Sequence, residues 1–441
     1  MSLESEVLGK IKPTADEIEK IDKAANALKK AVEDYIKEHN IDVEIRFVGS
    51  YAKGTYLSDP DIDLFILFPE TVSHKDLETV GLSVGSAVMK GGSTMYSEHP
   101  YTRGVFEEVD VDLVPSYSIK TTDKLRTAVD RTPFHTQFIL DNLKEEQKDE
   151  VRLLKKFMKG IGVYGAEPNT RGFSGYLCEL LVLFYGSFRR VLEQASWWKE
   201  GMIISIDKRG SPLMGPLVVY DPVDLKRNVA SAVHIDTMAL FIVAAKAYLA
   251  SPSEKFFFPQ ERQAYSRERL QAISDIHGSR IVTVVFDRPD IIEENLYSQL
   301  WKTRYALTRK LNDYDYNVLK AVHEMYEDEL EIAFELERDV LSMTYKHTGP
   351  PVWVRAAETF LAKWKENPYG PPFIEDGCWN VIAERMYVTA EEMLADEAAV
   401  SGIGREIDPN RMKIRDHEKS LNETNLLLLT ELLDPKNSWE V

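Results

Sequence analysis

Two carboxylates separated by one apolar residue, Asp61 and Asp63, open an apolar run that continues to Phe68. The run predicts a β-strand, and because side chains alternate faces along a strand, both carboxylates should share one face. Two like charges side by side repel each other unless a cation lies between them. Mg²⁺ prefers such oxygen ligands together with substrate phosphates. The pair therefore predicts a metal site for phosphate chemistry.

A Gly-Ser corner, Gly49-Ser50, lies about a dozen residues before the pair and follows a segment in which Val43, Ile45 and Phe47 alternate with polar residues. The alternation predicts a strand that runs into the corner. A helix beginning there could offer backbone N–H groups and a hydroxyl to a phosphate. Gly-Ser or Asp-x-Asp alone also occurs in ordinary turns. Their combination at this spacing predicts a nucleoside triphosphate held by a metal against the carboxylates.

A third strand, which also carries carboxylates, is predicted over residues 109–115. Its apolar residues face one side, while Asp110 and Asp112 face the other. Three carboxylates suit a two-metal phosphoryl-transfer site. The alternation cannot choose between Asp110 and Asp112, and an exposed face of an edge strand is the competing interpretation.

Composition indicates a multidomain protein in a reducing cytoplasm. The chain has 441 residues, enough for two to four domains, and only two cysteines, which excludes a disulfide framework. The N-terminus lacks an apolar signal region, and the most apolar run, 177–188, is too short to span a bilayer. A net charge of −18 argues against general nucleic-acid affinity but leaves room for local basic surfaces.

Along the chain, hydrophobic periodicity predicts an α+β architecture. Thr14 to Glu17 matches a capping box ahead of a helix. Further expected elements are a loop at 130–135, a basic helix at 149–159, a long helix from 174 to about 197, a turn at 221–228 leading into a helix, a strand at 281–286, helices at 290–312 and 318–326, and a strand at 329–337.

A set of motifs in one order resembles the archaeal, class I CCA-adding enzymes (CCA tRNA nucleotidyltransferases) of the DNA polymerase β-like nucleotidyltransferase superfamily. The match is dense over residues 47–231 and looser after 255. The motifs are Phe-Val-Gly-Ser-Tyr-Ala, Asp-Ile-Asp-Leu-Phe, Val-Asp-Leu-Val-Pro, Asp-Arg-Thr-Pro-Phe-His, Val-Arg-Leu-Leu-Lys, Gly-Val-Tyr-Gly-Ala-Glu, Arg-Gly-Phe-Ser-Gly-Tyr-Leu-Cys-Glu-Leu-Leu and Asp-Pro-Val-Asp-x-Lys-Arg-Asn-Val-Ala.

The resemblance implies template-independent addition and repair of the 3′-terminal CCA of tRNA from CTP and ATP, with release of pyrophosphate. It implies an α+β multidomain fold with three parts: a polymerase β-like catalytic domain at 1–142, a mostly helical nucleotide- and tRNA-binding domain at 143–254, and an α+β region with a tail at 255–441. The last part would hold the acceptor and T-stem arm of tRNA. A homodimer is also implied.

The resemblance assigns catalysis and the binding of two Mg²⁺ ions to Asp61, Asp63 and Asp112. The family places its third acid directly before Leu-Val-Pro, which favours Asp112 over Asp110. Nucleotide contacts are implied for Ser50, Lys53, His135, Lys155, Tyr164 and Arg227. Lys53, often Arg in the family, keeps the charge but loses the bidentate fork, whereas Arg227 matches the residue that reads the incoming base.

The sequence also allows two alternative functions. One is another polymerase β-like nucleotidyltransferase, poly(A)-polymerase-like or acting on a small molecule, which would keep the carboxylates but lose the grip on tRNA. The other is a non-catalytic RNA-binding scaffold, against which the intact carboxylates argue. On the CCA interpretation, basic residues of the C-terminal region would contact tRNA, namely Lys302, Arg304, Arg309 and Lys310.

Overall fold

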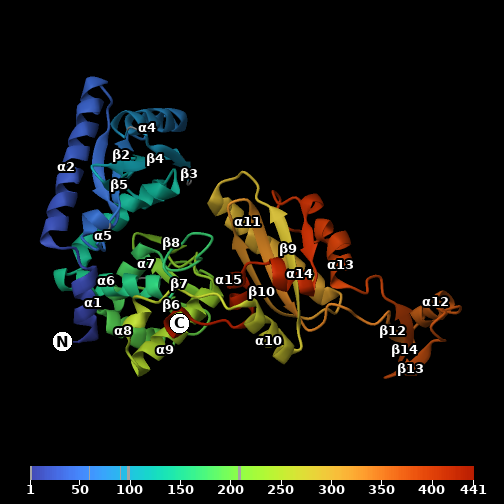
Figure 1. Ribbon diagram of the computed structural model, residues 1–441. Coiled ribbons are helices and arrows are strands. Elements are labelled where there is room, and N and C mark those ends of the chain that lie inside the picture. Colours follow the sequence, from blue (N-terminus) through green and yellow to red (C-terminus); the bar gives the residue numbers. More distant parts are fainter. Residues whose placement is uncertain (1, 59, 90, 97–99, 207–209) are drawn as a thin grey trace. The chain divides into compact units, whose positions relative to one another are not determined.

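The computed structural model describes residues 2–58, 60–89, 91–96, 100–206 and 210–441 (Figure 1). The chain packs into two compact units. The first unit comprises Met1–Gln260 together with Asn437–Val441, and the second comprises Glu261–Lys436. Among the helices of the described residues, none is both long and apolar enough to cross a membrane.

The first unit begins with a mixed sheet of strand order β1-β2-β5-β4-β3. Its strands are β1 (Glu44–Val48), β2 (Ile62–Phe68), β3 (Ser93–Tyr96), β4 (Pro100–Phe106) and β5 (Val109–Tyr117). β2 and β5 run parallel, whereas the other neighbours are antiparallel. The strands expected around both carboxylate motifs are confirmed.

Two helices, α2 (Ala15–Glu38) and α4 (His74–Val88), cover one face of this sheet (Figure 1). Thr14 and Glu17 form the expected capping box at the start of α2. Leu28 of α2 and Leu77 of α4 pack with Leu64 of β2 in one core. Because side chains alternate along β2, Asp63 lies on the opposite face, free of this core.

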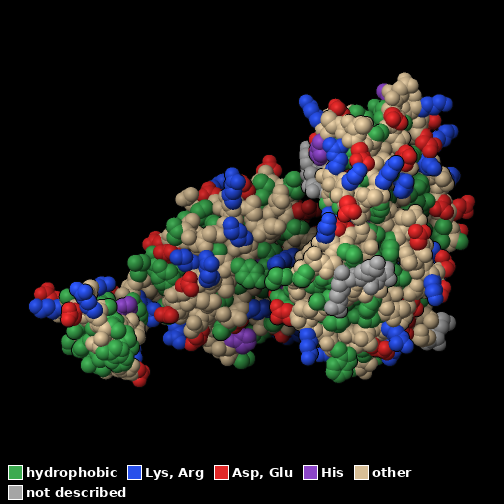
Figure 2. Space-filling model, turned by 180° about the vertical axis from the view of Figure 1, so that it is seen from behind, with side chains coloured by type: hydrophobic (Ala, Val, Ile, Leu, Met, Phe, Trp, Pro, Cys, Tyr) green, Lys and Arg blue, Asp and Glu red, His purple; other side chains and the backbone are tan. Residues whose placement is uncertain are grey.

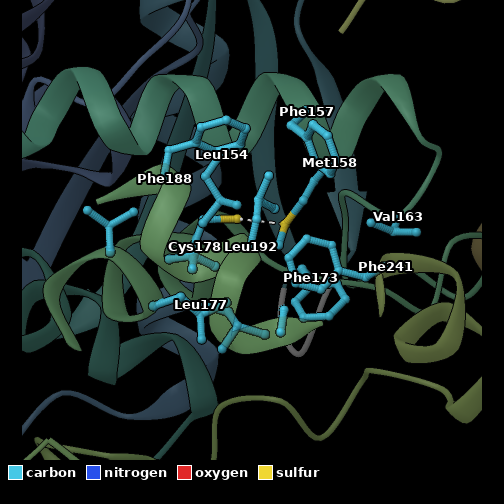
Figure 3. Packing of buried hydrophobic residues seen from close by; sticks show 14 of the residues in the cluster. Leu154, Phe157, Met158, Val163, Phe173, Leu177, Cys178, Phe188, Leu192 and Phe241 are labelled. Atoms are coloured by element: carbon cyan, nitrogen blue, oxygen red, sulfur yellow. Dashed lines mark hydrogen bonds between the residues drawn. The ribbon is translucent and has the colours of Figure 1, made fainter. Parts of the chain in front are cut away.

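The rest of the first unit is mostly helical. Its elements are α1 (Leu3–Ile11), α3 (Gly49–Lys53), α5 (Thr132–Asn142), α6 (Glu145–Gly160), α7 (Gly175–Tyr185), α8 (Phe188–Ala195), α9 (Ile235–Ala250) and a sheet of β6 (Met202–Ile204), β7 (Leu217–Asp221) and β8 (Asp224–Asn228). Buried side chains of α6, α7, α8 and α9 meet in one core (Figure 3). In it the Cys178 thiol lies 3.4 Å from the sulfur of Met158.

Three local expectations in this unit are wrong. Residues 132–135 begin α5 rather than a loop, because Pro133 occupies the first turn, where its missing N–H costs nothing. The single helix expected from 174 to 197 is two helices, divided at Gly186, whose φ of +98° a helix cannot contain. Residues 221–228 form the β7–β8 hairpin rather than a turn into a helix, and α9 begins only at Ile235.

The last residues of the chain return to the first unit. Trp439 stacks on Phe256 with ring centroids 5.1 Å apart, and the Ser438 hydroxyl donates a hydrogen bond to the Gly160 carbonyl at 2.7 Å. Phe256 and Phe257 are buried in the helical core although they follow residue 254, where the central domain was expected to end. The division into three domains itself stays a prediction.

The second unit contains two sheets. The larger has the order β10-β11-β9-β15, with helices packed on it, and the smaller has the order β12-β14-β13 beside α12. The strands are β9 (Arg280–Asp287), β10 (Val318–Met325), β11 (Glu329–Leu336), β12 (Thr344–Pro351), β13 (Phe373–Glu375), β14 (Cys378–Glu384) and β15 (Lys413–Arg415). The helices are α10 (Arg267–His277), α11 (Glu293–Asp313), α12 (Ala356–Lys363), α13 (Ala390–Glu397), α14 (His417–Glu423) and α15 (Leu426–Leu433).

Residues 318–326, expected to be helical, form strand β10 instead. Their apolar residues, Val318, Ala321, Val322 and Met325, have the spacing of a helix. Antiparallel pairing with β11 along its length overrides this local pattern. Hydrophobic side chains are exposed in and beside the smaller sheet, including Ile374 of β13 and Trp353, which follows β12. Figure 2 shows such side chains gathered on one lobe.

Removing the indole of Trp439 should destabilise the first unit. Trp439→Ala takes away a nearly buried ring that covers Phe256, so we expect a loss of about 3 kcal/mol in the free energy of unfolding, measured by denaturant titration. Trp197, which is 83% exposed, supplies the matched control, and Trp197→Ala should change little. Equal effects of the two substitutions would contradict the docking of the C-terminus.

Candidate active site

The pairing of β2 with β5 brings two of the predicted carboxylates together. Asp63 and Asp112 are directly opposed in the parallel register, so their side chains share one face. Asp61 immediately precedes β2. Asp110 is exposed and lies beyond the paired part of β2. The register therefore favours Asp112 over Asp110 as the partner of Asp63.

Arg103 of β4 lies between these acidic groups. Its Nη2 is 3.5 Å from Oδ2 of Asp61, and its Nε is 3.7 Å from Oδ1 of Asp112. The guanidinium thus supplies positive charge where three carboxylates would otherwise repel one another. Across the described residues, no three Asp, Glu, His or Cys side chains converge as a preassembled ligand group.

Asp63 and Asp112 have pKa values well above those of an ordinary aspartate. Burial and the negative charges of Asp112 and Asp61 together raise the pKa of Asp63 to about 7, against the opposing charges of Lys53 and Arg103. Burial also raises the pKa of Asp112 to about 6, against the lowering effect of Arg103. A nearby cation would stabilise the ionised form of carboxylates with such raised pKa values.

The chemistry of the three carboxylates fits a divalent cation. All are hard oxygen donors, the type that Mg²⁺ prefers. Oδ1 of Asp112 is buried and has no hydrogen-bond partner among the described residues, so one ligand atom is unsatisfied. Asp61, Asp63 and Asp112 are therefore the residues that could hold the metal.

A glycine permits the approach of the Gly-Ser corner to Asp63. Gly49 begins α3 with a φ of +69°, and a Cβ there would lie 1.9 Å from Oδ2 of Asp63. No other residue fits without moving the carboxylate. Ser50 follows as the second residue of α3 and is partly exposed. The corner thus begins a helix as expected, and it lies directly against the acidic group.

The two predicted lysines meet at a buried glutamate that sequence reasoning missed as a functional residue. Glu179 of α7 accepts hydrogen bonds from Lys53 at 2.5 Å, from Lys155 at 3.2 Å and from the Thr55 hydroxyl at 2.6 Å. Burial alone would raise the pKa of Glu179, but the two ammonium groups lower it to about 2. Burial likewise lowers the pKa of Lys155. The signal available in the sequence was a lone acid within the apolar run 177–188.

Tyr164 lies beside the same lysine. A Cβ on Gly175, the first residue of α7, would lie 2.9 Å from the Tyr164 hydroxyl and 3.6 Å from Cε of Lys155. Burial raises the pKa of this hydroxyl, so it remains protonated and can donate a hydrogen bond. The structure therefore brings Lys53, Lys155 and Tyr164 together near the start of α7.

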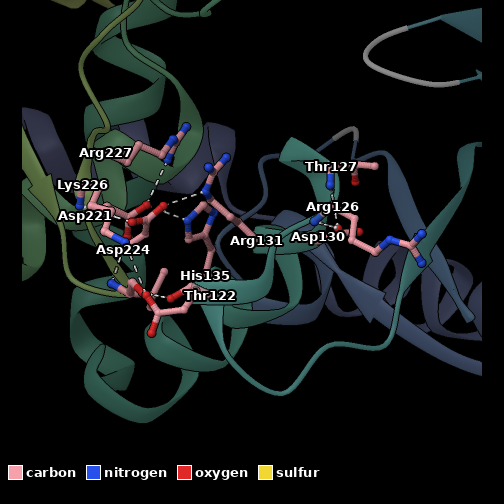
Figure 4. A network of polar contacts seen from close by, with 12 residues as sticks. Thr122, Arg126, Thr127, Asp130, Arg131, His135, Asp221, Asp224, Lys226 and Arg227 are labelled. Carbon is pink, nitrogen blue, oxygen red and sulfur yellow. Dashed lines mark hydrogen bonds and ion pairs between the residues drawn. The ribbon is translucent and has the colours of Figure 1, made fainter. Parts of the chain in front are cut away.

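His135 and Arg227 meet at a second buried carboxylate, Asp221, which was also not predicted as a site residue (Figure 4). Burial lowers the pKa of His135, so at neutral pH the imidazole is uncharged. Burial would raise the pKa of Asp221, but the hydrogen bond from His135 and the charge of Arg227 hold it below its ordinary value. The charge of Lys53 acts both on the carboxylates and on the residues around Asp221, because it lowers the pKa of Asp63 and also that of His135.

The sheet, its carboxylates and the nearby cations define a nucleotidyltransferase. The family model "Nucleotidyltransferase domain" matches residues 27–135, "tRNA nucleotidyltransferase, second domain" matches 149–258, and "CCA-adding enzyme, C-terminal domain" matches 277–416. The chain belongs to the CCA-adding enzymes, as its curated relatives show.

The enzyme of Methanosarcina mazei is 39% identical over 91% of this chain and 90% of its own, and that of Picrophilus torridus is 34% identical over 95% of both. The enzyme of Archaeoglobus fulgidus is 37% identical over 86% of this chain and 85% of its own. Among solved structures, the Cid1 poly(U) polymerase aligns with a TM-score of 0.45 and 15% identity over 57% of this chain and 94% of its own, a likeness too weak to bear on function.

Cation binding should weaken in mild acid. A carboxylate must be deprotonated to bind a metal, and with pKa values of about 7 for Asp63 and about 6 for Asp112 both become protonated as the pH falls from 8 to 5.5. We expect the affinity for Mn²⁺, measured by calorimetry without nucleotide, to fall at least about tenfold over this range. Asp110→Asn should change the trend little, because the charge of Asp110 is a minor contribution to the raised pKa of Asp112. A pH-independent affinity would refute the assignment.

Neutralising Glu179 should impair both stability and nucleotide binding. Glu179→Gln leaves two buried ammonium groups without their shared counter-charge, so we expect a loss of about 3 kcal/mol in the free energy of unfolding. Because the lysines lose their common anchor, KM for CTP should rise by about tenfold. Glu193→Gln, which removes an exposed ion pair with Arg189, is the control and should change neither quantity.

Proposed function

We propose that this protein adds and repairs the 3′-terminal CCA of tRNA, using CTP and ATP without a nucleic-acid template. The opposed carboxylates Asp63 and Asp112 carry the proposal, because they place acidic ligands at one point of a chain that matches CCA-adding enzymes over about nine tenths of its length. The arrangement supports transfer of a nucleotidyl group to a 3′-hydroxyl in the cytoplasm, with pyrophosphate as the leaving group.

In this proposal Asp61, Asp63 and Asp112 hold two Mg²⁺ ions. When bound, such ions lower the pKa of the attacking hydroxyl and neutralise charge on the triphosphate. Lys53 and Lys155 contribute further positive charge to the phosphates, with Ser50 and Tyr164 donating hydrogen bonds. Glu179 holds both ammonium groups in place between turnovers. Arg227 donates hydrogen bonds to the incoming base, and His135 contacts the nucleotide.

Product length tests the proposal. A tRNA transcript lacking CCA should gain three nucleotides with CTP and ATP together, and two with CTP alone, as resolved on a sequencing gel. A long homopolymer tail would instead support a poly(A)-polymerase-like enzyme, and tRNA binding without incorporation would support a scaffold.

Asp112 and Asp110 both lie on β5, so substituting each in turn distinguishes the loss of a metal ligand from the loss of any nearby negative charge. Asp112→Ala should reduce the rate of incorporation at least about 100-fold, because a metal ligand contributes several kcal/mol to the transition state. Asp110→Ala should retain activity within about threefold, since Asp110 lies beyond the paired part of β2. The reverse order of effects would show that the register does not define the site.

We further propose that the second unit holds the acceptor and T-stem arm of tRNA. On α11, Lys302 and Arg309 are exposed, and Arg309 makes one hydrogen bond, from Nη2 to the Ser401 carbonyl at 3.3 Å. Lys310 is paired with Glu397 at 2.6 Å, and Arg304 lies 4.0 Å over the Trp301 ring. The two exposed residues are thus the better candidates for phosphate contacts.

Reversing these two charges should weaken tRNA binding. The double substitution Lys302→Glu and Arg309→Glu should raise Kd about tenfold and reduce the salt dependence of binding by a slope of about 2. Lys23→Glu with Lys30→Glu, on the exposed side of α2, makes the same change of charge in the first unit. Equal weakening by the control pair would attribute the effect to net charge and not to α11.

A further inference from the structure

Asp221 accepts hydrogen bonds from three side chains of three different elements (Figure 4). Its Oδ2 accepts from Nε2 of His135 at 2.8 Å and from Nη1 of Arg227 at 3.0 Å. Its Oδ1 accepts from the Tyr176 hydroxyl at 3.2 Å and from the Val223 backbone N–H at 3.1 Å. The side chain is completely buried, so both oxygens are committed to the protein and none is left for a ligand.

The partners of Asp221 also hold one another. The rings of His135 and Tyr176 stack with centroids 4.0 Å apart, and each donates a hydrogen bond to a different oxygen of the carboxylate. These two residues lie on α5 and α7, both anchored in packed helices. These two residues therefore fix the Asp221 carboxylate in position without any contribution from Arg227 of β8.

Arg227 is held at one corner only. Its Nη1 binds Asp221, and no other hydrogen bond or ion pair of its guanidinium occurs among the described residues. Its side chain is 34% exposed, so the remaining N–H groups face accessible space. Because a guanidinium is planar and rigid, fixing one corner limits the directions of the other donors.

We infer that Asp221 is a positioning residue for base selectivity: it fixes the Arg227 guanidinium so that its free N–H groups accept cytosine and adenine and reject uracil and guanine. The inference rests on the base-reading role proposed for Arg227.

The chemistry of the four bases explains how one fixed donor can make this choice. The ring nitrogen on the pairing edge is a hydrogen-bond acceptor in cytosine and adenine, whereas in uracil and guanine it carries a hydrogen. A fixed donor directed at that atom is satisfied by the first two bases and faces another donor in the other two, which leaves both unpaired. A guanidinium that can rotate would instead donate to carbonyl oxygens of uracil and guanine, and the selectivity for cytosine and adenine would be lost.

The hairpin itself supplies the matched control. Asp224 begins β8, whereas Asp221 ends β7 of the same hairpin. Asp224 is nearly buried and pairs with Nε of Arg131 at 3.0 Å. Among the described ion pairs it has no contact with Arg227. Asp221→Asn and Asp224→Asn thus make the same change of one oxygen to an amide nitrogen within one hairpin. Only the first removes the charge that anchors Arg227.

The experiment measures kcat and KM for CTP and UTP with a tRNA that lacks CCA, and for ATP with a tRNA that ends in CC. Asp221→Asn should raise KM for CTP and ATP about tenfold, change kcat by less than about threefold, and lower the ratio of kcat/KM for CTP over UTP about tenfold, because a charge-assisted hydrogen bond is lost. Asp224→Asn should leave that ratio unchanged. An unchanged ratio in Asp221→Asn, or equal changes in both variants, would overturn the inference.

A double-mutant cycle identifies the residue through which Asp221 acts. Arg227→Ala should itself lower the CTP-over-UTP ratio, and adding Asp221→Asn should lower it no further. A further full loss in the Arg227→Ala background would show that Asp221 acts elsewhere. A normal ratio in Arg227→Ala would refute both the role of Arg227 and this inference, whereas a low ratio there with a normal ratio in Asp221→Asn would refute this inference alone.

A milder variant decides the matter if Asp221→Asn does not fold. Tyr176→Phe removes one hydrogen bond to Oδ1 and keeps the ring that stacks on His135. It should lower the CTP-over-UTP ratio about threefold while thermal unfolding confirms an intact protein. An unchanged ratio in folded Tyr176→Phe, where Asp221→Asn fails to fold, would count against the inference.

Discussion

Parallel pairing of β2 with β5 forces two carboxylates, Asp63 and Asp112, to occupy adjacent positions on one face of a sheet. Burial and mutual repulsion make this costly, which the raised pKa values of both groups express. Two nearby cations, Arg103 of β4 and Lys53 of α3, partly compensate this negative charge. Gly49 then allows the backbone to approach Asp63 where any side chain would collide. The acidic pair thus determines which residues can surround it.

The positive side of the site is organised by buried acids rather than by the substrate. Glu179 holds two lysines, and Asp221 holds His135 and Arg227. Both acids are fully buried, so their charges are compensated within the protein and the cations keep defined positions. Helix α7 contributes to both groups, through Glu179 to the lysines and through Tyr176 to Asp221. One short helix therefore links the lysine pair with the group of His135 and Arg227.

Local patterns were sufficient to predict the strands that carry Asp63 and Asp112, because alternation of apolar residues on a buried strand is a strong signal. The choice between Asp110 and Asp112 needed the register with β2, which alternation does not contain. Glu179 and Asp221 were missed because their roles depend on partners as far as 126 and 86 residues away in sequence. At 318–326 the helical spacing of apolar residues was misleading, because pairing with a distant strand decided the structure.

We propose that the opposed carboxylates Asp63 and Asp112 form the metal site of this nucleotidyltransferase. The most direct measurement is anomalous diffraction from crystals grown with Mn²⁺ and a non-hydrolysable CTP analogue. We expect manganese peaks within ligand distance of Asp63 and Asp112, with the triphosphate beside Lys53 and Lys155. Manganese bound elsewhere, or triphosphate bound without metal at Asp63 and Asp112, would contradict it.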